Sequence, residues 1–214
     1  MIRLGTCVFA AINRRFLKQH ERRRVNGIRI CAASSRGRET EEHVAEKVER
    51  ALLLISQYDP LRFRRLVRDI EIILVMREIP RASYDEDSRT CKVDVNFVVD
   101  KSVSIAEVAG TIVHEATHAR IHRAGIPTQT SNHARIERVC CKAKIAFGRR
   151  IPEGDSVIQD AQRCLEAVAG GNSQWVAGSV RNSYLKTRIL LMRELGAPRW
   201  AIRFAEYLLR KHAA

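Results

Sequence analysis

A run of apolar positions at helical spacing predicts a long helix that begins after Ser104. Ser104 and Glu107 match the S-x-x-E capping box, in which each side chain binds a backbone N–H of the first helical turn. Gly125 and Pro127 favour a helix end about twenty residues later. The apolar residues between these signals recur three or four positions apart: Ile105, Val108, Ala109, Ile112, Val113 and Ala116. The pattern therefore predicts a capped and strongly apolar helix.

The segments before this helix predict both helices and strands. Apolar spacing predicts one helix from Thr40 to about Asp59 and a shorter helix over residues 60–69. Residues 71–76 form the continuous apolar run of a buried strand. Residues 90–99 have the β-branched content and partial alternation of a second strand. Residues 80–89, which lie between these two strands, are expected to form a loop.

The segments after Pro127 predict helices alone. Ser131 or Asn132 can cap the first of them. Further helices are expected over residues 155–170, 184–195 and 198–211. Because the strands precede these helices and do not alternate with them, the predicted fold class is α+β.

Length and charge predict one domain with a basic N-terminal extension. The chain has 214 residues, is 45% hydrophobic, carries a formal net charge of +14, and has no apolar run of the roughly 18 residues that span a membrane. Residues 1–40 contain ten Lys or Arg against two Glu, a net of +8. We expect these residues to form a flexible extension or a loosely docked helix that attracts an anionic partner, either nucleic acid or a membrane surface. Residues 41–214 would then form the domain, with residues 41–125 holding the sheet and long helix and residues 126–214 the helical part.

The cellular location is expected to be the cytoplasm. The short apolar stretch near the N-terminus is followed by Arg14 and Arg15 and not by a small-residue cleavage site, so a signal peptide fits poorly. The six cysteines include no C-x-x-C pair. Reduced thiols are therefore expected in preference to disulfides.

The long helix carries a metal-binding pattern in its second half. His114, Glu115 and His118 form H-E-x-x-H, and residues four apart lie on the same face of a helix. Two imidazoles so placed can bind one Zn²⁺, and the Glu between them can take a proton from an attacking water. Metal-assisted hydrolysis is the chemistry that this pattern favours.

Glu137 is the best candidate for a third metal ligand. His122 lies one turn beyond His118, but at 1.5 Å per residue it is about 12 Å from His114 along the helix, too far to share one ion. Glu137 lies on the next predicted helix, at the edge of an apolar stripe that includes Ile136 and Val139. The residues of this stripe are Ile136, Val139, Cys140, Ala143 and Ala146. Cys140 and Cys141 on the same helix are alternative ligands, although buried cysteines more often act as small apolar residues.

The pattern His114-Glu115-x-x-His118, followed after eighteen residues by Glu137, resembles the gluzincin metallopeptidases over roughly residues 90–150. A looser likeness is to the ImmA/IrrE-type peptidases. The resemblance implies a zincin-like fold with a small mixed sheet packed on the H-E-x-x-H helix. It implies one catalytic Zn²⁺ held by His114, His118 and Glu137, with Glu115 as general base. Cys141 stands where gluzincins place an Asp that orients a zinc-bound His.

Further residues are candidates for supporting roles in catalysis. Hydrolysis needs a donor for the oxyanion, and His133, Tyr184 or Tyr84 could supply it. Zincins also present a strand edge to the substrate backbone, and the predicted strand over residues 90–99 is expected to serve there.

Two functions are consistent with these residues. The first is a zinc metallopeptidase that hydrolyses peptides or proteins. The alternative is a non-proteolytic metal-binding module of zincin fold, whose basic arm binds nucleic acid or another anionic partner. Glu115 favours the peptidase, because a protein that only binds has no need of a general base at that position.

Overall fold

The computed structural model describes residues 17–34, 37–77, 81–127, 132–170, 199–200 and 202–203. In this part of the chain a small mixed sheet is combined with several helices, so the α+β prediction is confirmed. The strands are β1 (Glu21–Val25), β2 (Ile28–Ala32), β3 (Ile72–Met76), β4 (Ala82–Asp85) and β5 (Thr90–Asp94). The helices are α2 (Arg38–Tyr58), α3 (Pro60–Asp69), α4 (Val95–Val99), α5 (Ile105–Arg123), α6 (His133–Gly148) and α7 (Asp155–Ala169). The helix predicted over residues 184–195 lies outside the described residues, as does most of that predicted over residues 198–211.

The five strands form one sheet in the order β1-β2-β3-β5-β4. The three central strands β2, β3 and β5 run parallel, and each outer strand pairs antiparallel with its neighbour. Alternate residues of β3 lie on opposite faces, with Ile73 and Val75 in the main core and Ile72, Leu74 and Met76 on the other face. The buried strand predicted over residues 71–76 is therefore confirmed.

Two sequence predictions on the last strands are wrong. Residues 82–85, expected to be loop, form β4, which pairs with β5 in the register Ala82↔Val93 to Asp85↔Thr90. Residues 90–99, expected to be one strand, are β5 followed by α4. The strand stops because the Asp94 side chain accepts a hydrogen bond from the Phe97 N–H and thereby caps α4. The edge strand at this side of the described sheet is β4 and not the segment 90–99, and β4 lies against α5.

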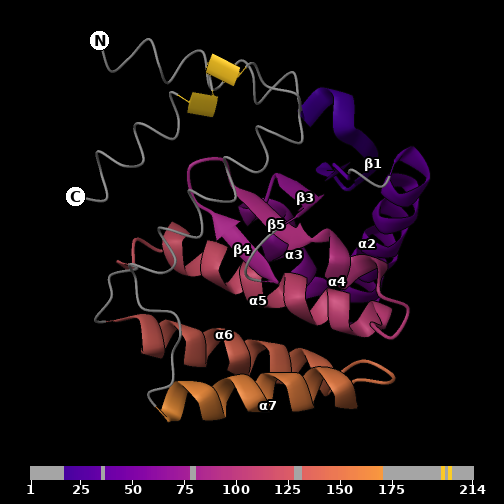
Figure 1. The fold of residues 1–214 in the computed structure, drawn as a ribbon. Coiled ribbons are helices and arrows are strands. Elements are labelled where there is room, and N and C mark those ends of the chain that lie inside the picture. The colour runs from indigo at the N-terminus through magenta and orange to yellow at the C-terminus, as the bar shows by residue number, and fades with distance from the viewer. Residues whose placement is uncertain are drawn as a thin grey trace.

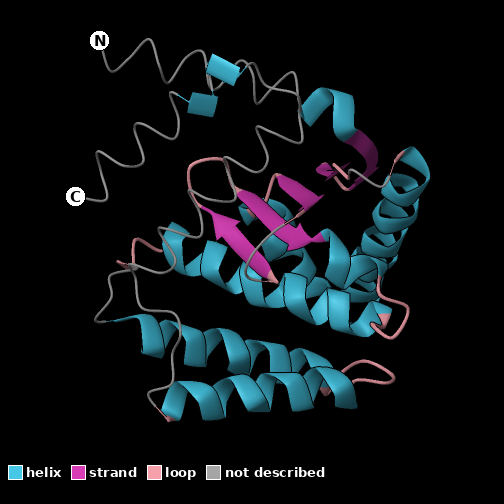
Figure 2. Ribbon diagram, in the orientation of Figure 1, coloured by secondary structure: helices cyan, strands magenta, loops and turns pink. Residues whose placement is uncertain are grey.

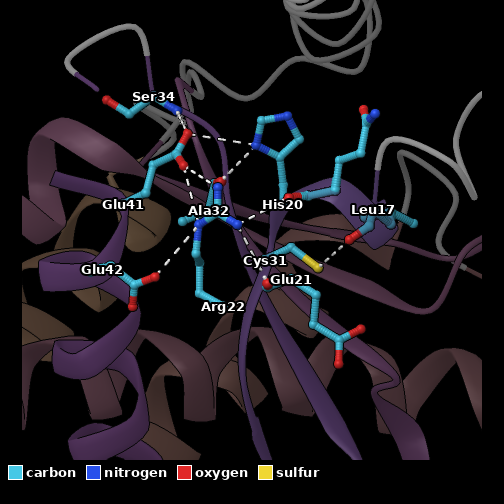
Figure 3. Close-up of polar contacts among 10 residues, drawn as sticks. Leu17, His20, Glu21, Arg22, Cys31, Ala32, Ser34, Glu41 and Glu42 are labelled. Carbon is cyan, nitrogen blue, oxygen red and sulfur yellow. Dashed lines mark hydrogen bonds and ion pairs between the residues drawn. The ribbon is translucent and has the colours of Figure 1, made fainter. Parts of the chain in front are cut away.

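The N-terminal segment also departs from the sequence prediction. Residues 21–32, which we expected in a flexible extension or a loosely docked helix, form the β1–β2 hairpin, and β2 pairs with β3 inside the sheet. Glu41 in α2 fixes this hairpin, because its buried carboxylate binds the Arg22 guanidinium and accepts the Ser34 N–H (Figure 3). Arg23 and Arg24 pair with glutamates of the same region. Several of the charges that suggested an anionic partner are thus neutralised within the fold, whereas residues 1–16 lie outside the described part of the chain.

The described elements form layers around α5. One face of the sheet packs on α2, α4 and α5, and the α6–α7 hairpin packs against α5 from the other side (Figures 1 and 2). The long helix is thus enclosed, which explains its apolar sequence. Among the described residues, no helix combines the length and the apolar character needed to cross a membrane.

Small residues let α6 and α7 approach each other and α5. A Cβ built on Gly110 of α5 would lie 2.6 Å from Val157 Cγ1 of α7. A Cβ built on Gly154, in the turn before α7, would lie 1.9 Å from the Gly148 carbonyl oxygen. Among real structures such distances do not occur, so these positions require glycine for space and not for backbone conformation.

Gly154→Ala is expected to destabilise the protein by about 1–3 kcal/mol, the usual cost of overpacking. Gly170→Ala is a matched control at the other end of α7. Its φ of −74° is close to the −76° of Gly154, but its nearest neighbour would lie 3.5 Å from the new Cβ. Urea unfolding of both variants measures the difference; equal midpoints would show that the Gly148–Gly154 contact does not constrain the turn.

Candidate metal centre

Helix α5 presents His114 and His118 on one face, and its start is as predicted. The Ser104 hydroxyl accepts the Glu107 N–H at 3.1 Å, and the Glu107 carboxylate accepts the Ser104 N–H at 2.8 Å. The C-terminal end is at Arg123, followed by Gly125 with a φ of +71°, a conformation that favours glycine. The two imidazole rings lie side by side with centroids 5.0 Å apart.

Helix α6 brings Glu137 to these two histidines. The Glu137 Oε2 atom lies 3.3 Å from His114 Nε2, and Oε1 lies 3.2 Å from His118 Nε2. The two Nε2 atoms are themselves 3.2 Å apart. All three side chains are partly buried, with exposed fractions of 15–21%. The structure therefore joins the three residues that the sequence singled out as metal ligands.

The spacing of the two imidazole nitrogens is close to that around one tetrahedral zinc ion. Ligand nitrogen and oxygen atoms at about 2.0–2.1 Å from zinc, seen at the tetrahedral angle, lie about 3.3–3.4 Å from one another. The Nε2–Nε2 separation of 3.2 Å is close to this spacing, and each imidazole lies 3.2–3.3 Å from a different oxygen of the Glu137 carboxylate. Two imidazoles and one carboxylate are also a common donor set for catalytic zinc. The residues present could thus hold the ion that the resemblance implies and leave a fourth position open.

The side chains of the centre strongly perturb each other. Burial alone would lower the pKa of His118, but hydrogen bonds with Cys140 and Glu137 and the charge of Glu115 raise it well above its ordinary value. Burial would raise the pKa of Glu137, but hydrogen bonds from His114 and His118 bring it far below its ordinary value. Glu137 therefore stays ionised between the two imidazoles.

Two of the remaining catalytic candidates are near the cluster. Glu115 is buried in α5, with 7% of its surface exposed, and its charge acts on both His118 and Cys140. His133, in the first turn of α6, has its Nε2 atom 3.7 Å from Glu137 Oε1. Both side chains therefore lie near His118 or Glu137.

The other candidates are elsewhere. His122 binds Glu86 at 3.2 Å, and its ring lies 6.4 Å from that of Tyr84, so both aromatic rings belong to the end of α5 beside β4. The exclusion of His122 as a ligand agrees with this position. Tyr184 lies outside the described residues.

Sulfur atoms surround the cluster more closely than the sequence suggested. Cys140 and Cys141 are fully buried in α6, and each can be grouped with His114 and one further ligand so that all donor atoms lie within 4.8 Å of one another.

The predicted stripe of α6 is wrong at Val139 and Ala146, which are exposed; Cys141, Lys144 and Phe147 are buried instead, because α6 is enclosed by both α5 and α7.

Cys164 of α7 was missed by the sequence analysis. Its Sγ atom lies 2.6 Å from that of Cys141. The hydrogen bond from Cys141 lowers the pKa of the Cys164 thiol to about 7 and raises that of Cys141. A signal was present, because Cys141 lies eleven residues before Pro152 and Cys164 eleven residues after Glu153. In an antiparallel helix hairpin, residues equally distant from the turn lie opposite each other.

Zinc is expected to stabilise the protein more at pH 8 than at pH 5.5. In metal-free protein the raised pKa of His118 contributes stability that is complete below about 6.5 and is lost as the pH rises through the higher folded value. The lowered pKa of Glu137 contributes above about 4.5 and is lost as the pH falls. Zinc requires neutral imidazoles, so its contribution grows with pH. Thermal unfolding with zinc or chelator at both pH values gives the two differences in Tm; a smaller difference at pH 8 would contradict the prediction.

A scan of the sequence against models of protein families finds no match, and searches of curated proteins and of solved structures likewise find none. The interpretation of this centre therefore rests on its own residues and their geometry.

Proposed function

We propose that this chain is a zinc-dependent metallopeptidase, with His114, His118 and Glu137 as ligands and Glu115 as general base. The observation that carries the proposal is the meeting of His114, His118 and Glu137, with the two Nε2 atoms 3.2 Å apart and each within 3.2–3.3 Å of one Glu137 carboxylate oxygen. Three protein ligands with a fourth position left open are typical of catalytic zinc sites, whereas structural sites are closed by four.

The chain's own residues supply the proton transfers. A zinc ion bound here would polarise the scissile carbonyl and acidify water. Glu115 follows His114 directly and is buried, so its carboxylate is shielded from bulk solvent and can accept the proton of the attacking water. The same carboxyl then donates that proton to the leaving amine. His133, one turn before Glu137, is the residue assigned to stabilise the developing oxyanion.

The substrate is assigned to the β4 side of α5. β4 is an edge strand of the described sheet and contacts the active-site helix α5. In this proposal a peptide would run along β4 by main-chain pairing, which selects extended substrates with little regard to their side chains. The substrate class is therefore an extended peptide or an unfolded segment of a protein.

Cleavage of a peptide library by the purified protein tests the proposal. We expect hydrolysis that stops when a chelator removes the metal and returns when zinc is restored. Cleavage that continues unchanged in the chelated protein would contradict a zinc-dependent mechanism. A protein that binds zinc and cleaves none of the library would favour the non-proteolytic alternative.

A further inference from the structure

A pair of cysteines lies directly beside the metal centre, on two different helices. Cys141 of α6 is buried, and Cys164 of α7 is partly exposed. Their Sγ atoms are 2.6 Å apart, closer than two sulfur atoms in ordinary van der Waals contact. A disulfide requires about 2.05 Å, so the two side chains already point toward each other. Little movement separates the two thiols from a bond.

The packing of α6 on α7 fixes this pair. The glycine contacts at Gly148 and Gly154 set the turn, and the buried Lys144 binds Asp160 one turn from the cysteines. Arg81 binds the same Asp160 and ties the hairpin to the start of β4. The helices therefore cannot slide past each other without breaking a buried ion pair, and the register that opposes Cys141 and Cys164 is maintained.

Cys141 also belongs to the surroundings of the metal ligands. Its sulfur, together with donor atoms of His114 and Glu137, forms a group whose members lie within 4.8 Å of one another. Glu137 lies about one helical turn before Cys141 on α6, so both occupy the same face. A change in the bonding of Cys141 therefore takes place next to two of the three proposed ligands.

We propose that Cys141 and Cys164 are a site of reversible disulfide formation that ties α6 to α7 beside the metal centre. The oxidant is a low-molecular-weight disulfide such as oxidised glutathione. The partly exposed Cys164 thiolate attacks it, which forms a mixed disulfide and releases one glutathione thiolate. The Cys141 thiolate then attacks the Cys164 sulfur and releases the second. Two protein thiols lose their protons, and two electrons pass to glutathione disulfide.

The disulfide leaves the proposed zinc ligands in place. Its formation removes the Cys141 thiol as a donor but does not involve His114, His118 or Glu137. The statement about zinc rests on the proposed function, whereas disulfide formation does not. Oxidised protein is therefore expected to retain about one zinc ion per chain, bound by nitrogen and oxygen atoms alone.

Oxidation of the full-length protein by excess oxidised glutathione tests the site. We expect the loss of two titratable thiols, a mass lower by about two hydrogens, and a cross-linked peptide pair containing Cys141 and Cys164, all reversed by dithiothreitol. Cys164→Ala should prevent the cross-link, and Cys31→Ala, in the sheet, should not. A cross-link from Cys164 to Cys140, or two lost thiols in Cys164→Ala, would overturn the proposal. If Cys164→Ala fails to fold, the peptide map of the wild type decides alone.

Zinc analysis of the same samples separates the two proposals. Disulfide with zinc retained supports both. Disulfide accompanied by loss of zinc would support the cysteine pair and contradict the three-ligand centre, because Cys141 would then be a ligand. Absence of the disulfide in a protein that binds zinc would overturn only the cysteine proposal.

Discussion

His118→Ala is expected to lose its zinc, whereas His122→Ala is expected to keep it. The two histidines lie on the same helix, one turn apart, and neither is fully buried. The His118 Nε2 atom lies 3.2 Å from both His114 Nε2 and Glu137 Oε1, whereas His122 binds Glu86 instead. Loss of a direct ligand costs more than the roughly 10–100-fold in affinity that removal of a residue hydrogen-bonded to a ligand costs.

Metal content after gel filtration provides the measurement. Wild type and His122→Ala should carry about one zinc ion per chain, and His118→Ala close to none. Circular dichroism of each variant shows whether the fold is intact, which matters because removal of His118 also breaks its hydrogen bonds with Glu137 and Cys140. Equal zinc content in the two folded variants would show that His118 is not a zinc ligand.

The elements that could be predicted from the sequence are those with local signals. The capping box at Ser104 and Glu107 and the apolar spacing after it define α5, and Asp59 with Pro60 divides α2 from α3. In α3 the Asp59 side chain accepts the Arg62 N–H, the contact that such a cap predicts. These interactions form within a few residues, so no knowledge of the tertiary structure was needed.

The strands at both ends of the sheet could not be predicted in the same way. β1 is rich in arginine, and its place depends on carboxylates of α2, above all Glu41, that lie far along the chain. β4 has an intermediate exposure throughout and lacks the alternation of a half-buried strand, so only its pairing with β5 identifies it. Strand pairing between distant segments is a tertiary property that periodicity does not reveal.

The distinction between local signals and tertiary contacts also applies to the residues of the candidate metal centre. His114 and His118 are related by helix geometry alone, and this makes the motif readable. Glu137 required the assumption that two helices pack antiparallel, an assumption that the contact between α5 and α6 supports. Cys164 lies on a third helix and required the register of α6 on α7, which is fixed by the close contact of Gly148 with Gly154. A residue of the centre was thus harder to predict from the sequence when its position depended on the packing of more helices.

Glu115→Gln is expected to retain zinc and to lose peptide hydrolysis. Glutamine has nearly the same size and shape, so the buried position on α5 remains filled. The amide cannot accept a proton from water, and loss of a general base lowers the rate by on the order of 10²–10⁴. Glu115 is not one of the three proposed ligand residues, so zinc content should stay near one per chain.

The control for this change is Glu166→Gln, which alters the net charge equally at an exposed position of α7. It should cleave the peptide library at the wild-type rate. A Glu115→Gln variant that also cleaves at that rate would show that another group takes the proton, and the assignment of Glu115 would be wrong. A variant that loses both zinc and activity would instead place Glu115 among the groups that hold the metal, since its charge already acts on His118. The comparison of metal content with rate thus separates a base from a ligand, which neither measurement achieves alone.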